Sequence, residues 1–179
     1  AYVNLNEPLF LDNPRQLLYT AIHESSHVLY DRIHEFSDSL GSHLLDSSKG
    51  RQSFFTTLFH TEAFATYTPL ALRKADGISG DPEHPICRDY HVISDDQELQ
   101  EHVAAYDSFR ETLRSGESSR EMVLTRTFDT RLPYRVGCAM LKKIEEQYGV
   151  DELRKAFHMP PEEFIKTYNS ILKEYRNAP

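Results

Sequence analysis

Residues 14–34, PRQLLYTAIHESSHVLYDRIH, form the stretch on which the prediction of the fold depends. The proline at its first position suits the start of a helix, and Asp12 or Asn13 can cap that start. No other proline or glycine interrupts the run, so one long helix is predicted. Its apolar stripe at helical spacing comprises Leu17, Leu18, Ala21, Ile22, Ser25, Val28, Leu29 and Ile33, and an adjacent stripe carries His23, His27, Tyr30 and His34.

Residues 23–27 of this helix read HESSH, which supplies the groups that zinc-dependent hydrolysis needs first. His23 and His27 are four positions apart, so both imidazoles leave the same face of the helix and can bind one zinc ion. Glu24 can reach a metal-bound water and serve as its general base. The pattern fixes only three positions in a chain rich in histidine and glutamate, so its surroundings must support it. The alternative is a surface helix carrying two solvated histidines.

A zinc site of this kind needs a third protein ligand. The metzincin pattern fails, because Tyr30 and Ile33 stand where its glycine and third histidine would be. Glu62 is the better candidate, since it shares a predicted helical face with apolar side chains and a carboxylate is costly to bury unless it is paired or metal-bound. His60 and Thr61 project from other faces and are weaker alternatives.

A di-iron carboxylate site is the other metal centre to consider, because it uses a Glu-x-x-His pair from each of two helices. Glu24 and His27 would form one such pair. No second pair exists, since Glu98, Glu101 and His102 do not have the required spacing. The di-iron interpretation is therefore disfavoured.

The motif followed by Glu62 in the segment TEAFA, 35 residues after His27, resembles the gluzincin metallopeptidases, whose third ligand is a glutamate on a second helix. The segment PYRVGCAML, residues 133–141, is similar to the Tyr-x-x-Gly opening of a helix in the aminopeptidase N-like branch. The resemblance implies a zincin-like catalytic domain that binds Zn²⁺ through His23, His27 and Glu62. It also implies that Tyr134 stabilises the transition-state oxyanion.

The sequence departs from that branch at its amino-terminal end. The G-x-M-E-N segment that binds the substrate amino terminus has no counterpart in residues 1–22, so exopeptidase activity is not carried over. Where gluzincins place a twisted sheet, only residues 2–5 can form a short strand. Because the chain starts at Ala1 rather than Met, we expect a carboxy-terminal part of a longer protein or a processed product. An upstream segment or a partner chain would then complete the fold.

The expected reaction is hydrolysis of a peptide bond in a peptide or protein substrate. Water bound to zinc has a pKa of about 7, and Glu24 would take its proton and deliver it to the leaving amine. Tyr134 would donate a hydrogen bond to the developing oxyanion. Rivals for that last task are Tyr67, which ranks second, and His60, His84 and His91.

Two non-enzymatic alternatives stay open. One is a catalytically inactive metallopeptidase-like binding module or a subunit of a larger assembly. The intact Glu24 weighs against it, because loss of the base is the simplest way to inactivate such a site. The other alternative is a helical interaction domain in which the motif is accidental.

The expected fold class is mainly α, and the 179 residues suffice for a single domain with a core. Helical patterns cover about residues 14–34 and 54–72, and a carboxy-terminal helical part covers about 97–177. Residues 37–53 and 74–96 are expected to be loops, of which the second could roof the cleft. Helices of the carboxy-terminal part are expected over 97–115, 133–148, about 151–157 and 161–176, and the first has a buried stripe of Leu99, Val103, Tyr106, Phe109 and Leu113.

Composition excludes some classes of function. The formal net charge of −8 and the scattered basic residues argue against a nucleic-acid-binding face. No hydrophobic run reaches the length of a membrane span, and residues 1–22 show no signal peptide, so no compartment is assigned. Cys87 and Cys138 could form a disulfide, stay free or bind another group, and with only two cysteines buried or idle thiols are favoured.

Overall fold

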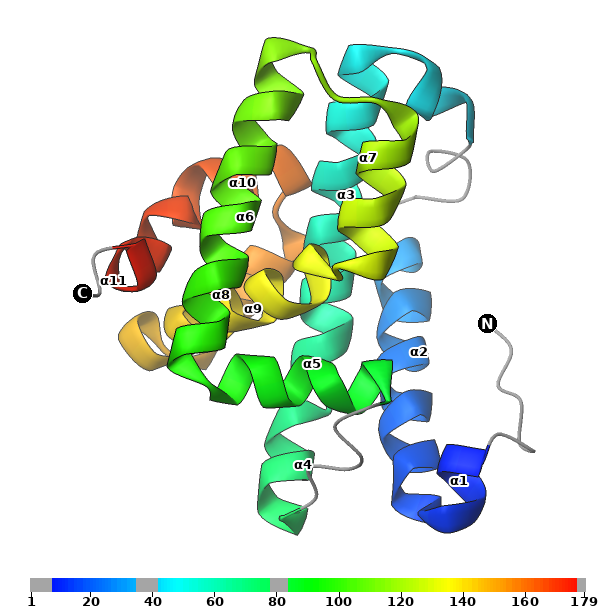
Figure 1. The fold of residues 1–179 in the computed structure, drawn as a ribbon. Helices are drawn as coiled ribbons and strands as arrows, with labels where there is room; N and C mark the ends of the chain where they lie inside the picture. The colour runs from blue at the N-terminus through cyan, green and yellow to red at the C-terminus, as the bar shows by residue number, and fades with distance from the viewer. Residues whose placement is uncertain (1–7, 35–41, 78–83, 177–179) are drawn as a thin grey trace.

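The computed structural model describes residues 8–34, 42–77 and 84–176, and every regular element in those ranges is helical (Figure 1). The mainly helical fold is thereby confirmed, whereas the strand expected at residues 2–5 lies outside the described residues. The α-helices are α1 (Pro8–Asp12), α2 (Pro14–His34), α3 (Ser48–Tyr67), α4 (Leu70–Asp76), α5 (Pro85–Ser94), α6 (Asp96–Ser115), α7 (Arg120–Leu124), α8 (Leu132–Tyr148), α9 (Val150–His158), α10 (Pro161–Tyr168) and α11 (Lys173–Arg176). Short turns of other helix types are η1 (Ser42–Asp46), η2 (Thr125–Asp129) and η3 (Asn169–Leu172).

Helix α3 is the centre of the molecule, and every residue from Phe54 to Thr66 is buried. It makes its most extensive contact with α8, which crosses it closely. Gly137 of α8 faces Ala63 of α3 so closely that a Cβ added at position 137 would lie 2.6 Å from the Ala63 Cβ. The absence of a side chain at position 137 therefore allows the two helices to approach to this distance.

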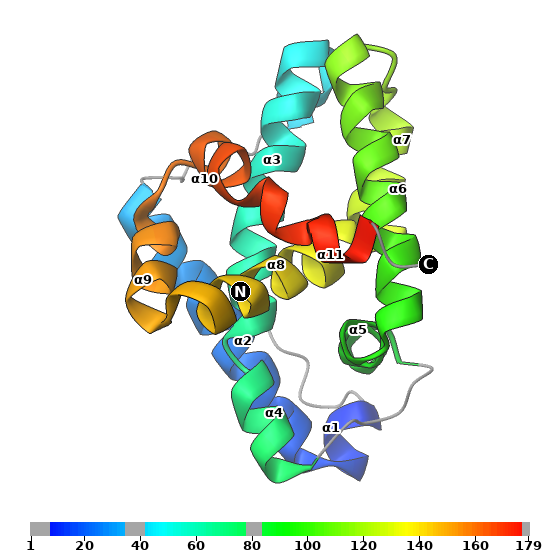
Figure 2. The ribbon, with the colours of Figure 1, turned by 90° about the vertical axis from the view of Figure 1, so that its left-hand side faces the viewer.

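The main apolar core lies between α3, α6, α8 and the helices that follow α8, which Figure 2 shows gathered around the middle of α3. Helix α6 buries all five residues of the predicted stripe, so that prediction is confirmed. Aromatic rings join α6 to α3: the Phe59 and Tyr106 rings stack with centroids 4.8 Å apart, and Phe55 meets Phe109 edge to face at 5.0 Å. Such ring pairs stabilise a core beyond the area that they bury.

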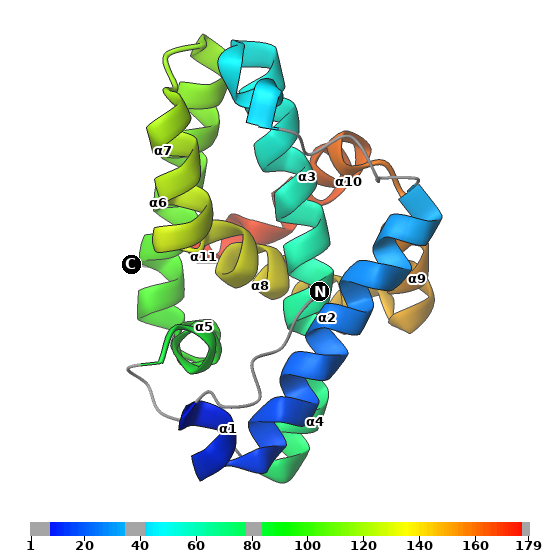
Figure 3. The same cartoon turned by 90° about the vertical axis from the view of Figure 1, so that its right-hand side faces the viewer.

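Helix α2 lies on the side of α3 away from α6 (Figure 3) and buries an unexpected face. Its buried residues are Gln16, Tyr19 and Tyr30, which belong to the polar side of the helix. Residues of the predicted apolar stripe are exposed instead, namely Leu18 at 40%, Val28 at 47% and Leu29 at 52%. The interpretation of that stripe as the buried face of α2 is thus wrong, because the helix turns its imidazoles and phenols toward α3 instead.

A buried hydrogen-bond chain fixes α2 against its neighbours. The Tyr30 hydroxyl donates to His60 Nδ1 at 2.6 Å, and His60 Nε2 donates to the Ala156 carbonyl of α9 at 3.0 Å. Burial lowers the pKa of His60 to about 3, so the ring is neutral and can accept and donate at once. His60 is therefore part of the packing between three helices.

Several predicted boundaries need correction. The helix expected over about 54–72 begins earlier, because the Ser47 side chain caps it, and it ends before Pro69, after which α4 follows separately. Within residues 74–96, expected to be a loop, α5 forms with His84 as its N-cap. Residues 161–176 are α10, η3 and α11 rather than one helix.

The structure agrees with the sequence on the state of the two cysteines and on membrane-spanning helices. Cys87 and Cys138 are buried and are not joined in a disulfide. Among the described residues, no helix has the length and apolar character needed to cross a membrane.

Candidate metal centre

Three side chains of the ligand type meet between α2 and α3. His23 and His27 lie one turn apart on α2, and their Nε2 atoms are 3.1 Å apart. Glu62 of α3 places its Oε2 3.5 Å from His23 Nε2 and 3.4 Å from His27 Nε2. A tetrahedral zinc ion with bonds of about 2.0–2.1 Å would hold its ligand atoms about 3.3 Å apart. The three separations therefore fit one face of such a tetrahedron.

The carboxylate of Glu62 has the environment of a cation ligand. The residue is 7% exposed, and its Oε2 has no hydrogen bond of ordinary length within the described part of the chain. Burial would raise the pKa of Glu62, but the contacts with His23 and His27 outweigh it and lower this pKa to about 2. An ionised, buried carboxylate without a hydrogen-bond partner at one oxygen is costly unless a cation compensates it. The donor set of two imidazoles and a carboxylate suits Zn²⁺.

His27 is oriented by a second contact on α3. Its Nδ1 lies 3.3 Å from the Thr61 Oγ1, which leaves Nε2 directed at Glu62 and His23. Burial opposes protonation of this ring, but the Glu62 carboxylate more than offsets it and raises the pKa of His27. Contacts to the second ring nitrogen commonly fix the tautomer of a metal-binding histidine. Thr61, considered above as a ligand, is thus placed to orient a ligand.

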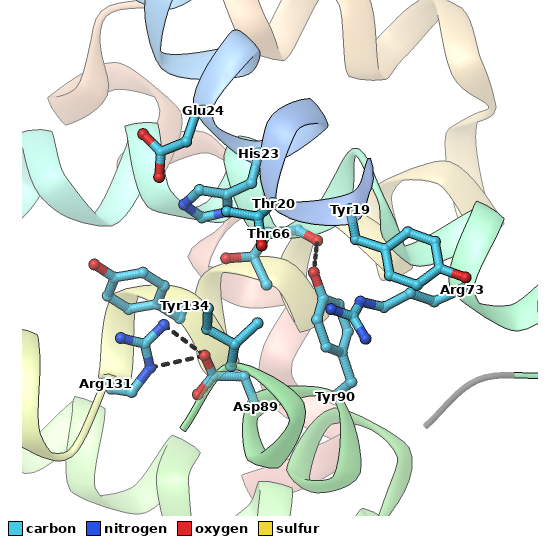
Figure 4. Close-up of a pocket in the computed structure, with 11 residues that line it drawn as sticks. Tyr19, Thr20, His23, Glu24, Thr66, Arg73, Asp89, Tyr90, Arg131 and Tyr134 are labelled. Atoms are coloured by element: carbon cyan, nitrogen blue, oxygen red, sulfur yellow. Dashed lines mark hydrogen bonds and ion pairs between the residues drawn. The ribbon is translucent and has the colours of Figure 1, made fainter. Parts of the chain in front are cut away.

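Glu24 and Tyr134 lie beside the triad on opposite walls of one cavity. Glu24 follows His23 on α2, and Tyr134 comes from the first turn of α8 (Figure 4). The Tyr134 ring is parallel to the His23 ring within 3°, with centroids 6.4 Å apart. Burial, followed by the charge of Glu62, raises the pKa of Tyr134, so its hydroxyl is protonated at neutral pH. The structure thus brings the five predicted site residues into one region.

The rivals of Tyr134 have other surroundings. The Tyr67 hydroxyl donates to Glu145 of α8, and His60 belongs to the hydrogen-bond chain described above. The Nδ1 of His84 accepts a hydrogen bond from the first turn of α5. His91 lies on α5 and is not among the residues that line the cavity.

A cluster of charged residues that the sequence pattern does not predict lies on the far wall of the cavity. Arg131 immediately precedes α8 with a φ of 53°, the left-handed conformation that residues other than glycine rarely adopt. Its guanidinium lies 3.6 Å above the centre of the Tyr134 ring and binds Asp89, a residue of α5 that is 2% exposed. The proline that follows at position 133 signals a helix start, but no pattern in the sequence signals the conformation of Arg131 or its partner.

Comparison of the chain with protein-family models, with curated protein sequences and with solved structures found no match. The chemistry of the site is therefore inferred from its own geometry.

Proposed function

We propose that this protein is a zinc-dependent peptidase. The observation that carries the proposal is the convergence of His23 Nε2, His27 Nε2 and Glu62 Oε2 at separations suited to one tetrahedral ion. Three ligands from the protein leave a fourth position for water, which is the composition of a catalytic rather than a structural zinc site. Glu24 follows His23 in the sequence, and the Tyr134 ring lies parallel to the His23 ring. Both residues line the adjoining cavity and supply the remaining groups in this proposal.

In this proposal zinc, when bound, lowers the pKa of water and polarises the substrate carbonyl. Glu24 takes the proton from the attacking water and returns it to the leaving amine. The Tyr134 hydroxyl donates a hydrogen bond to the oxyanion as it forms. Arg131, stacked on the Tyr134 ring, holds that ring in place from the other side.

A second candidate function is a metal-binding subunit of a larger assembly without catalysis. One observation favours it: the helix that carries His23 and His27 exposes Leu18, Val28 and Leu29 on its outer face. Large apolar side chains gathered on one face are typical of interaction surfaces. The presence of Glu24 in the cavity favours the enzyme, and measurements of metal content and cleavage separate the two functions.

The first measurement is the zinc content of the full chain after dialysis against dilute zinc. Wild type is expected to retain about one zinc per chain, and His23→Ala and Glu62→Ala to lose it. His158→Ala is the matched control, because His158 is exposed on α9 and takes no part in the triad. Retention of zinc by His23→Ala would refute the assignment of the ligands.

The second measurement is cleavage of a mixed peptide library, followed by mass spectrometry. Glu24→Gln should keep zinc and lose about 10²–10⁴-fold in rate, because the amide cannot accept the proton. Tyr134→Phe should also keep zinc and lose less, about 10²–10³-fold, if its hydroxyl acts on the oxyanion. Stoichiometric zinc without any cleavage by wild type would instead support the binding subunit.

A further inference from the structure

A cavity of about 190 Å³ adjoins the candidate metal centre and is walled by α2, α3, α4, α5 and the start of α8 (Figure 4). His23 and Glu24 line one side of it. Arg73, Asp89 and Arg131 line the rest, together with tyrosines and threonines. Because pockets for whole small ligands measure about 300–1,000 Å³, this cavity has room for one end of a substrate rather than all of it.

Two arginines and two carboxylates line the cavity, but they are unevenly distributed: Glu24 lies beside His23, whereas Arg73, Asp89 and Arg131 lie on the other walls. Asp89 accepts from Arg131 Nε at 2.7 Å and from Arg135 Nε at 2.9 Å, so one buried carboxylate serves two guanidinium groups. The third guanidinium, that of Arg73, has no carboxylate within ion-pair distance in the described residues. The neighbouring Asp76 is engaged by the Tyr19 hydroxyl at 2.6 Å.

Arg73 is 3% exposed, and its contacts are with uncharged groups. Its Nη2 donates to Gln16 Oε1 at 2.7 Å, and its guanidinium lies between the rings of Tyr19 and Tyr90, 4.4 and 4.2 Å from their centres. Aromatic faces attract a cation but do not neutralise it. A guanidinium buried in this way is costly unless an anion joins it.

Polar atoms without partners are concentrated on this same wall. Arg73 Nε and Nη1, Thr20 Oγ1 and Thr66 Oγ1 have no hydrogen-bond partner in the part of the chain that the structure describes, and all three residues line the cavity. Two of these four atoms can only donate, and the hydroxyls can donate as well. The complementary ligand group is therefore a small anion with several acceptor atoms.

We propose that this cavity binds a carboxylate of the substrate, adjacent to the bond that is cleaved. The inference rests on the proposed peptidase function and names its substrate class: peptides with a negative charge close to the scissile bond. Arg131 and Arg73 supply the positive charge, and the threonine hydroxyls supply further donors. The carboxylate comes either from the carboxy terminus of a peptide or from an aspartate or glutamate side chain.

Binding is tested separately from cleavage, with N-acetylglycine and N-acetylglycinamide as probes of equal size that differ in charge. Each is titrated into the full chain by calorimetry, with zinc and again without it. Wild type should bind the acid about tenfold or more tightly than the amide in both states, because hydrogen bonds between charged groups are the strong ones. Equal affinity for acid and amide would overturn the inference.

Arginine variants show where the acid binds. Arg131→Asn keeps a residue that tolerates the left-handed conformation and should lose the preference for the acid. Arg73→Lys keeps the charge but not the fork of donors, and should reduce that preference. Arg114→Gln removes an exposed arginine from the distant end of α6 and should preserve it. A preference unchanged in Arg131→Asn and Arg73→Lys, with both variants folded by circular dichroism, would also refute the site.

Cleavage then identifies the source of the carboxylate. One pair of peptides differs only in a free or amidated carboxy terminus, and a second pair only in Asp or Asn next to the cleaved bond. The pair in which the acid is cleaved about tenfold faster identifies the source. Cleavage without preference in either pair would refute the inference and leave the peptidase function intact. Preferential binding of the acid without any cleavage would refute the peptidase function, and with it the assignment to a peptide substrate, but would leave the carboxylate site itself in place.

Discussion

Gly137→Ala tests whether the close crossing of α3 and α8 sets the geometry of the candidate centre. The added Cβ would lie 2.6 Å from the Ala63 Cβ, and ordinary contact begins at 3.4 Å, so the helices would have to separate by about 0.8 Å at that point. The Ala63 Cα and the Phe59 carbonyl oxygen, both backbone atoms 3.2 Å away, cannot swing aside. Separation of the two helices is therefore the expected response.

The expected cost follows from two opposing terms. Overpacking a core costs about 1–3 kcal/mol, and alanine gains about 1 kcal/mol over glycine within a helix. Because backbone atoms form part of the clash, we expect the free energy of unfolding to fall by about 2 kcal/mol. The separation also moves Tyr134 away from Glu62, and a displacement of about 1 Å can cost about 100-fold in rate. Zinc content should stay close to that of wild type, since the ligands lie on α2 and α3.

The assays are urea unfolding, zinc analysis and peptide cleavage on the same preparations. Ala63→Gly is the matched partner, because it removes the atom that the new methyl group meets. By itself it should cost about 1 kcal/mol of helix propensity, but combined with Gly137→Ala it should restore part of the stability and activity. If Gly137→Ala leaves the protein as stable as wild type, the close crossing does not constrain α8.

Three further predictions concern charge. His102 Nδ1 donates to the Glu98 carbonyl and its Nε2 accepts from Arg135, and burial lowers the pKa of His102. As the pH falls toward and below the ordinary pKa of 6.5, the unfolded chain therefore binds more protons than the folded one. The free energy of unfolding should then fall on acidification by at most about 1.4 kcal/mol per pH unit from this group. In thermal melts at several pH values, His102→Gln should weaken that dependence, and the control His158→Gln should not. Asp89→Asn, which leaves two partly buried guanidiniums uncompensated, should lower the free energy of unfolding by about 3–5 kcal/mol in urea, whereas Asp151→Asn at an exposed pair should change it by less than about 1 kcal/mol. Zinc at about 100 times its Kd should stabilise the chain by about 2.7 kcal/mol, so a Tm unaffected by chelation would contradict metal binding.

Local periodicity accounts for much of what the sequence predicted. The bounds of α2 agree, and so does the buried stripe of α6, because both depend on residues three and four positions apart within one helix. The shared face of His23 and His27 follows from the same spacing. Glu62 was identifiable because a carboxylate among apolar residues is unusual enough to demand a partner. These inferences need no knowledge of how the helices pack.

Long-range packing accounts for what the sequence did not reveal. The apolar stripe of α2 indicated that this helix would bury its leucines. Its buried face meets a polar cavity instead, so Leu18 and Val28 stay exposed. Asp89 stood in a predicted loop, and its two arginine partners are more than forty positions away along the chain. No local signal links such residues.

The opening stretch, residues 14–34, thus specified a helix and two imidazoles on one of its faces, because hydrogen bonding between residues four apart is a property of the chain alone. Which face of α2 is buried, and which carboxylate, phenol and guanidiniums surround the imidazoles, depends on the packing of α2 against α3 and of α3 against α8. The residues that line the cavity come mainly from five helices, α2, α3, α4, α5 and α8, and only the packing of these helices brings charges from distant parts of the chain together.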